Sequence, residues 1–181
     1  MDSSAIINTL QAAVAGVTLE NGASIDMPTI YVPADRLVET CQALRDLSSL
    51  RYEVLVEITA ADYFPREPRF EVVYHLLSVA NRTRLRLKVR VPSDGAVPTV
   101  QSVWRGAGWP EREVWDMFGI FIDGHKDLRR LLMPEDWEGH PARKDYPVQI
   151  KMTPKVYEPL QVTAEEFAAN IQKNRDRARE Q

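Results

Sequence analysis

The sequence predicts an α+β fold: an antiparallel sheet with helices packed on one face, plus an extended irregular C-terminal segment. Three stretches alternate apolar and polar residues with a period of two, which is typical of strands covered on one face. Other stretches space apolar residues at helical intervals, which predicts amphipathic helices. The chain has 181 residues, of which 44% are hydrophobic and 27% charged, enough for one packed domain.

The three predicted strands define a core face and a polar face. Their core-facing residues would be Tyr52, Val54, Val56 and Ile58, then Phe70, Val72, Tyr74 and Leu76, then Leu85, Leu87, Val89 and Val91. The third strand carries a basic stripe on its other face: Arg84, Arg86, Lys88 and Arg90. Apolar positions change from even to odd numbers between the last two strands, so a tight turn at Ala80-Asn81 would place Glu71 opposite Arg90.

The rest of the first 120 residues reads as short helices joined by loops. Helices are expected at 3–17, 34–47, 99–105 and 110–119, the last ending at Gly119. Cys41 falls on the apolar stripe of the second helix, which predicts a core thiol. Residues 24–32 read as a strand, and Pro28 suggests an edge position. Residues 92–98 are expected to form a loop.

Beyond residue 120 the periodicity stops, although aromatic residues continue. Glycines and prolines interrupt 120–160, and a long segment of this kind usually has a function. Thr163 and Glu166 form a capping box, which predicts a final helix. We expect an α+β domain over residues 1–150 and a C-terminal extension over 151–181, with a short helix, that wraps a partner.

Composition excludes several kinds of protein. The net charge of −3 gives no basic field for nucleic acid. A single cysteine cannot form a disulfide or hold an iron–sulfur cluster within one chain. The N-terminus has no basic region followed by an apolar run, so it does not read as a signal peptide. No apolar run is long enough to cross a bilayer.

Acidic and histidine residues cluster between 111 and 140, which raises the possibility of a metal or acid–base site. The cluster comprises Glu111, Glu113, Asp116, Asp123, His125, Asp127, Asp136 and His140. It lacks HExxH and CxxC spacing, and basic residues flank the acids. Paired charges that fix loop geometry are therefore favoured, and a stand-alone metal-dependent enzyme remains the alternative from another class. No nucleotide-binding glycine motif or GxSxG is present.

The aromatic and arginine content favours a protein-binding surface over an RNA-binding sheet. RNA-binding sheets stack bases on outward aromatics, whereas the aromatics of this sheet belong to the core-facing set. Trp, Tyr and Arg are enriched at interface hot spots. Trp104 and Trp115 are expected in the core, while Trp137 and Tyr146 fit either the core or an interface. Arg143, Lys144, Asp145 and Tyr146 are expected to point outward, with Arg143 in a buried charge pair with a partner.

The string EREVWDMFGIFIDGHKDLRRLL (111–132), followed by MPEDWEGHPARKDYP (133–147), resembles the C subunit of bacterial respiratory complex I, the 30 kDa subunit family. TAADY (59–63) and RFEVVYHLLSVANRTRLRLKV (69–89) are also similar to the family. Departures from the family pattern stand at Pro110, Trp115, Lys126 and Ala142. The residues predicted as family signature or partner interface are Glu111, Arg112, Glu113, Asp116, His125, Arg129, Arg130, Trp137, Arg143, Lys144, Asp145 and Tyr146.

The resemblance implies a non-catalytic docking subunit in the peripheral arm of proton-translocating NADH:quinone oxidoreductase. It implies a place on the cytoplasmic side of the bacterial inner membrane, against the quinone-site D subunit with the B and I subunits nearby. It implies no cofactor in this chain, although the whole complex uses FMN, iron–sulfur clusters, NADH and quinone. The equivalent subunit of a related hydrogenase-like or ferredoxin-fed complex remains the close alternative.

Overall fold

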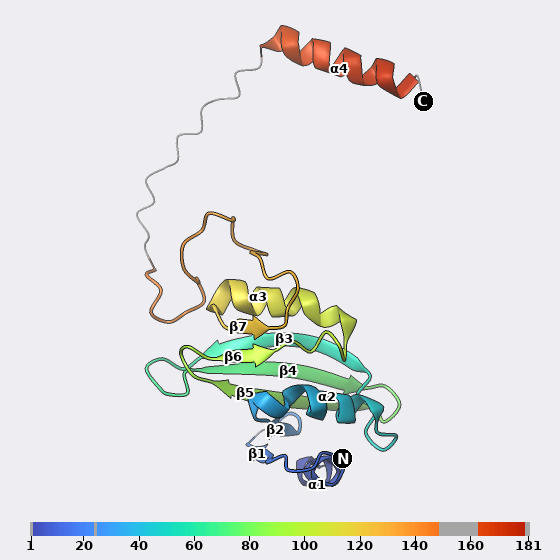
Figure 1. Cartoon of the computed structure of the whole chain (residues 1–181), viewed down its shortest axis with the longest axis vertical. Coiled ribbons are helices and arrows are strands. Elements are labelled where there is room, and N and C mark those ends of the chain that lie inside the picture. The colour runs from blue at the N-terminus through green and yellow to red at the C-terminus, as the bar shows by residue number, and fades with distance from the viewer. Residues whose placement is uncertain (1, 24, 149–162, 180–181) are drawn as a thin grey trace. The chain divides into compact units, whose positions relative to one another are not determined.

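The computed structural model describes residues 2–23, 25–148 and 163–179, in two compact units. The first unit runs from Met1 to Tyr146 and contains the sheet, and the second runs from Pro147 to Gln181 and contains one helix among its described residues (Figure 1). The predicted partner-wrapping stretch, with Tyr157, lies outside the described residues.

The elements follow one another in a mixed order. They are α1 (Ser3–Ala13), β1 (Glu20–Gly22), β2 (Thr29–Tyr31), the 3₁₀ helix η1 (Ala34–Arg36), α2 (Leu37–Asp46), β3 (Val54–Asp62), β4 (Phe70–Ser78), β5 (Thr83–Val91), β6 (Ala96–Pro98), the 3₁₀ helix η2 (Arg105–Ala107), α3 (Gly108–Phe118), β7 (Phe121–Asp123) and α4 (Ala164–Arg179).

A five-stranded sheet, ordered β1-β2-β5-β4-β3, forms the centre of the first unit. The three long strands are antiparallel neighbours, which confirms the α+β class. Glu71 lies opposite Arg90 and Tyr74 opposite Leu87, so the register expected from the alternation is confirmed. One cluster of buried side chains joins the sheet to α1, α2 and α3, and Cys41 is fully buried in it as expected.

The strand expected at 24–32, at the edge of the sheet, is wrong in extent and position. The strand there is the shorter β2, which pairs in parallel with β5, while β1 takes the edge beside it. Pro28 precedes β2 and offers only its carbonyl, which accepts the backbone N–H of Arg86 at 2.9 Å. A proline just before a strand removes no hydrogen bond between strands, so Pro28 is compatible with a strand inside the sheet and does not indicate an edge.

The core face expected for the first long strand is also wrong in part. Val54 and Val56 were expected inside, yet they are 37% and 52% exposed. A β-bulge between Leu55 and Glu57 shifts the pairing, so that Leu55 faces Leu76 and Ile58 faces Tyr74. An extra residue in one strand reverses the facing of the residues before it.

Two further expectations between 92 and 105 are corrected. Residues Ala96–Pro98, expected in a loop, form β6, which pairs in parallel with β7. Residues 99–105 were expected as a helix, but 101–103 form a turn and Arg105 begins η2. The side chain of Glu111 accepts the backbone N–H of Val100 at 2.7 Å. Trp104 is nevertheless in the core, as expected, and Trp115 packs against it partly buried.

The C-terminal unit contains the expected final helix. Thr163 and Glu166 exchange the hydrogen bonds of a capping box at the start of α4. Phe167 and Ile171 are exposed within this unit, so the apolar side of the helix is thin. No helix among the described residues is both long and apolar enough to span a membrane.

Candidate functional site

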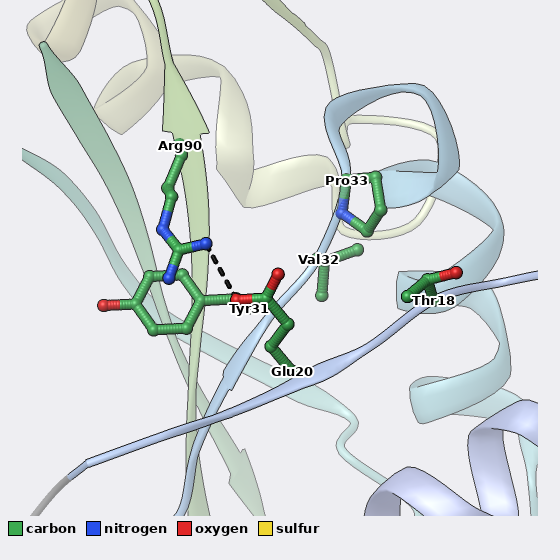
Figure 2. Close-up of a pocket in the computed structure, with 6 residues that line it drawn as sticks. All are labelled: Thr18, Glu20, Tyr31, Val32, Pro33 and Arg90. Carbon is green, nitrogen blue, oxygen red and sulfur yellow. Dashed lines mark hydrogen bonds and ion pairs between the residues drawn. The ribbon is translucent and has the colours of Figure 1, made fainter. Parts of the chain in front are cut away.

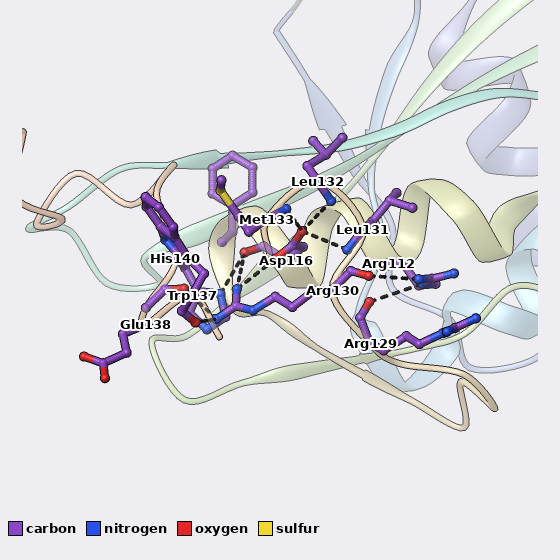
Figure 3. Close-up of polar contacts among 12 residues, drawn as sticks. Arg112, Asp116, Arg129, Arg130, Leu131, Leu132, Met133, Trp137, Glu138 and His140 are labelled. Atoms are coloured by element: carbon purple, nitrogen blue, oxygen red, sulfur yellow. Dashed lines mark hydrogen bonds and ion pairs between the residues drawn. The ribbon is translucent and has the colours of Figure 1, made fainter. Parts of the chain in front are cut away.

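One face of α3 holds the irregular segment that follows it. Trp109, Arg112 and Asp116 are spaced three and four residues apart and therefore line one side of the helix. The chain from His125 to Tyr146 folds back along this side, and its backbone bonds to the side chains of α3 (Figure 3). The charged residues singled out by the sequence are thus brought together.

Asp116 is the centre of this network. Its fully buried carboxylate accepts the backbone N–H groups of Leu131, Leu132 and Met133 on one oxygen, at 2.9, 2.7 and 3.0 Å. The other oxygen accepts the Arg130 guanidinium at 2.8 Å. Burial alone would raise the pKa of Asp116, but these hydrogen bonds outweigh it and lower the pKa.

Two arginines complete the attachment of the segment. Arg112 donates to the carbonyls of Arg129 and Arg130, and its guanidinium lies 5.1 Å from the ring centre of Trp109. Arg130 donates to the carbonyls of Trp137 and Gly139 as well as to Asp116. Both cations therefore hold backbone in place, and the contact of Arg130 with Asp116 is a charge pair of the kind predicted, whereas the Arg112 hydrogen bonds are to carbonyls.

The same segment caps the C-terminal end of α3. A helix leaves its last carbonyls without intrahelical partners. Here His140 Nδ1 lies 2.9 Å from the Asp116 carbonyl oxygen, and the Ala142 N–H donates to Met117. Arg143 donates to the carbonyls of Phe118 and Gly119. Burial, with the nearby arginines, lowers the pKa of His140 despite this backbone bond.

The expected outward orientation of the 143–146 string is wrong for Arg143 and Tyr146, which are partly buried. Arg143 turns onto the end of α3 and over the Phe70 ring, and Asp145 binds Arg69. The Tyr146 hydroxyl donates to the Glu138 carbonyl. Lys144 and Asp145 are both exposed, and among the described residues the Lys144 side chain makes no such contact. Arg143 folds back because the end of α3 offers unsatisfied carbonyls, whereas Asp145 and Tyr146 find their partners outside α3.

Gly119 gives a direct test of this packing. Its φ of +71° is left-handed, and an added Cβ would meet the side chains of His140 and Arg143. Gly119→Ala should therefore lower the free energy of unfolding by about 1–2 kcal/mol or more, measured by urea titration. Gly106→Ala is the control, because a Cβ there meets nothing within 4 Å. Equal effects of the two variants would contradict this packing.

Glu111 and His125 form a second buried pair at the start of α3. Glu111 accepts from Thr99 Oγ1 and the Val100 N–H, both at 2.7 Å. His125 Nδ1 accepts the Asp127 N–H, so Nε2 is the donor to the Gly108 carbonyl, at 3.0 Å. Both side chains are therefore hydrogen-bonded to backbone groups and hold the chain in place around the start of α3. Arg112 follows Glu111 in the sequence, but the expected charge pairing is wrong for Glu111, whose hydrogen bonds come from a hydroxyl and from amides.

Sequence reasoning missed the buried ion pair that anchors the end of the segment. Arg69 donates two bonds to Asp62, at 2.9 and 2.7 Å, and two to Asp145, at 3.0 and 2.6 Å. The Lys144 N–H also donates to Asp62. Burial opposes ionisation of Asp62, but the Arg69 and backbone hydrogen bonds lower its pKa to about 2. Asp145 lies 76 positions from Arg69, and nothing local in the sequence signals the contact.

The remaining predicted site residues lie at or near the surface. Glu113 is exposed, and Arg129 is exposed beside Asp127 at 2.9 Å. Trp137 is partly buried and lies outside the hydrophobic core cluster. Trp109, one of the aromatic residues that suggested a binding surface, is 66% exposed, and Leu132 is 57% exposed. Among the described residues, no three His, Cys, Asp or Glu side chains are grouped to hold a metal ion.

The fold and this network define a class of protein: an α+β module whose charged residues position a surface segment. The family model for the respiratory-chain NADH dehydrogenase 30 kDa subunit matches residues 30–151. The chain therefore belongs to that family.

Curated relatives agree with this assignment. The C subunit of NADH-quinone oxidoreductase from Roseiflexus sp. (strain RS-1) is 45% identical over 82% of this chain and 86% of the relative. The C subunit of the same enzyme from Geobacter metallireducens (strain ATCC 53774 / DSM 7210 / GS-15) is 50% identical over 67% of this chain and 75% of the relative.

A solved structure is similar in fold. One chain of the membrane-bound sulfane sulfur reductase, an archaeal respiratory membrane complex, superposes with a TM-score of 0.67 at 26% identity. The match covers 86% of this chain and 95% of that one.

Proposed function

We propose that this chain is a docking subunit of the peripheral arm of proton-translocating NADH:quinone oxidoreductase, on the cytoplasmic side of the bacterial inner membrane. Its contacts would be with the quinone-site D subunit, with the B and I subunits nearby. One observation carries the proposal. The carboxylates of Glu111 and Asp116 in α3 are buried, and both accept hydrogen bonds from backbone N–H groups of neighbouring segments.

Such a network supports docking rather than chemistry. A catalytic acid or base must reach a substrate, whereas Asp116 is enclosed by the segment it holds. What the network presents to the outside is the α3 surface, formed by the exposed side chains of Trp109, Arg129 and Leu132. Figure 3 shows the Leu132 side chain directed away from the Asp116 carboxylate that binds its backbone. Trp and Arg are frequent hot-spot residues.

We further propose that the chain itself holds no cofactor, while the assembled enzyme uses FMN, iron–sulfur clusters, NADH and quinone. The single cysteine, which is buried in the core, supports this. Burial raises the pKa of the Cys41 thiol, with a further contribution from Glu111, and a protonated thiol is a poor metal ligand.

A second candidate is the equivalent subunit of a related respiratory complex with another electron donor or acceptor. The structural similarity to a sulfane sulfur reductase chain favours it. The greater identity to NADH-quinone oxidoreductase subunits favours the first candidate.

Affinity purification of the tagged chain under mild detergent distinguishes these functions. We expect a membrane complex that oxidises NADH and reduces a quinone analogue, with the quinone-site D subunit in equal amount. A complex that accepts electrons only from ferredoxin or hydrogen would support the second candidate. A chain recovered alone, with stoichiometric metal and hydrolytic or redox activity of its own, would contradict both.

A further inference from the structure

The outer face of the sheet, turned away from the core, has two dissimilar ends. At the end where Glu71 and Arg90 lie, the charged side chains form ion pairs with one another. Glu71 accepts from Tyr31, Tyr63 and Lys88, and Arg90 pairs with Glu20 at 2.8 Å. Figure 2 shows Arg90 against the Tyr31 ring with its bond to Glu20. The cations of this end are therefore already neutralised within the chain.

The opposite end, at the β4–β5 hairpin, exposes aliphatic side chains. The bulge in β3 leaves Val54 and Val56 turned to solvent, and Val54 lies opposite Leu77 of β4. Val79 follows in the hairpin and is 59% exposed. Leu77 is partly buried. Aliphatic residues are thus adjacent on a face that carries charges elsewhere, which is the pattern of an interaction site.

Three exposed arginines border these aliphatics. Arg84 lies directly opposite Leu77, and Arg51 and Arg82 occupy the two adjoining loops. The Asn81 amide donates to the carbonyls of Ser49 and Leu50, so the two loops are held together. Within the described part of the chain, the side chains of the three arginines make no hydrogen bond or ion pair.

The backbone at two of these arginines supports a functional reading. Arg51 and Arg82 have φ of +47° and +54°, a region that favours glycine and asparagine. A residue with a Cβ has an energetic cost at both positions, and among the described residues no side-chain hydrogen bond or ion pair of Arg51 or Arg82 offsets it. Backbone strain of this kind, observed first, is a reasonable ground for a hypothesis of function.

We propose that this end of the sheet is a second docking surface, the hairpin surface, defined by Arg51, Val54, Val79, Arg82 and Arg84. Its partner is a surface of another subunit that presents carboxylates beside apolar side chains; this rests on the proposed function. Glu53 and Glu57 are the carboxylates bordering the patch, and three arginines outnumber them. Arginine binds carboxylates through two parallel hydrogen bonds, which makes charge complementarity specific.

A protein partner fits better than a lipid surface. Membrane interfaces use Trp and Tyr as anchors, and anionic lipid is bound by clusters of four to eight basic residues. The hairpin surface has three arginines, and its apolar residues are aliphatic only. Anionic lipid is therefore the alternative that the test must be able to detect.

Photo-crosslinking in the intact complex tests the hairpin surface. A photo-reactive phenylalanine replaces Val79 in one strain and Leu132 in another, and crosslinked peptides are identified by mass spectrometry. We expect Val79 to crosslink to an Asp- or Glu-rich peptide of another subunit. Arg82→Gln with Arg84→Gln should reduce that yield about threefold to tenfold, the effect of losing two exposed ion pairs.

The matched control is Arg66→Gln with Arg105→Gln, which removes the same charge from exposed arginines elsewhere and should leave the yield unchanged. A phospholipid adduct at Val79, a yield insensitive to Arg82 and Arg84, or no adduct at Val79 while Leu132 still crosslinks would overturn the hairpin surface alone. Loss of adducts at both positions, in a chain that recovers no other subunit, would overturn the proposed function as well.

Discussion

Replacing Asp116 by alanine should lower the free energy of unfolding by about 3–5 kcal/mol. The substitution leaves the Arg130 guanidinium and three backbone N–H groups without their common acceptor in a buried site. Because the lost bonds join the 131–133 backbone to α3, the amides there should also exchange hydrogen faster. Urea titration and hydrogen exchange of the full chain measure both effects.

Glu113→Ala is the matched control for Asp116. It lies on the same helix but is exposed, so the change in unfolding free energy should stay within about 0.5 kcal/mol. A loss of less than about 1 kcal/mol in Asp116→Ala, with residues 131–133 still protected, would contradict the role given to this carboxylate.

Arg69→Met should be comparably destabilising, by about 3–5 kcal/mol at neutral pH. Methionine keeps much of the apolar bulk between Phe64 and Phe70 but leaves the Asp62 carboxylate buried without its cation. Asp145→Asn is the control. The Asp145 side chain is 45% exposed, so losing its bond to Arg69 should cost about 1 kcal/mol or less.

The pH dependence distinguishes this ion pair from simple packing. Asp62 has a folded-state pKa of about 2, below the unfolded value of about 3.9, so its ionised form stabilises the fold above about pH 4. That stability, about 2–3 kcal/mol, is lost as the pH falls from about 5 to about 2. The difference between the parent protein and Arg69→Met should therefore shrink on acidification. A difference that stays constant from pH 7 to pH 3 would mean that Arg69 stabilises by packing alone.

Periodicity predicted the parts of the fold that are set by neighbouring residues. The alternation in β4 and β5 is unbroken, so the positions of the apolar residues determined their register. The same reasoning failed in β3. The apolar residues still alternate in the sequence there, but a bulge between Leu55 and Glu57 turns Val54 to the other face of the sheet. The parallel pairing of β2 with β5 depends on the path of the chain between them, which alternation does not encode.

The sequence predicted which residues belong to the site better than it predicted the contacts that each of them makes. Charged residues from 111 to 146 were singled out, and Asp116 with Arg130 confirms that their charges pair. Arg143 was predicted to pair with a partner subunit, but its contacts are backbone carbonyls at the end of α3. Every residue has such a carbonyl, so the sequence does not show which ones bind a side chain. The Asp62–Arg69–Asp145 contacts were missed because they join positions far apart in the chain.

Under the proposed function, α3 and its attached segment would hold a docking surface and take no part in the chemistry. The most direct measurement is quinone-reductase turnover per assembled complex in a Trp109→Ser, Leu132→Ser double variant, with Ile25→Ser as an exposed apolar control. We predict that the double variant reduces the amount of assembled complex while each complex formed turns over at the parent rate. Normal assembly with a large loss of turnover per complex would contradict the claim, because it would place this surface in the reaction itself.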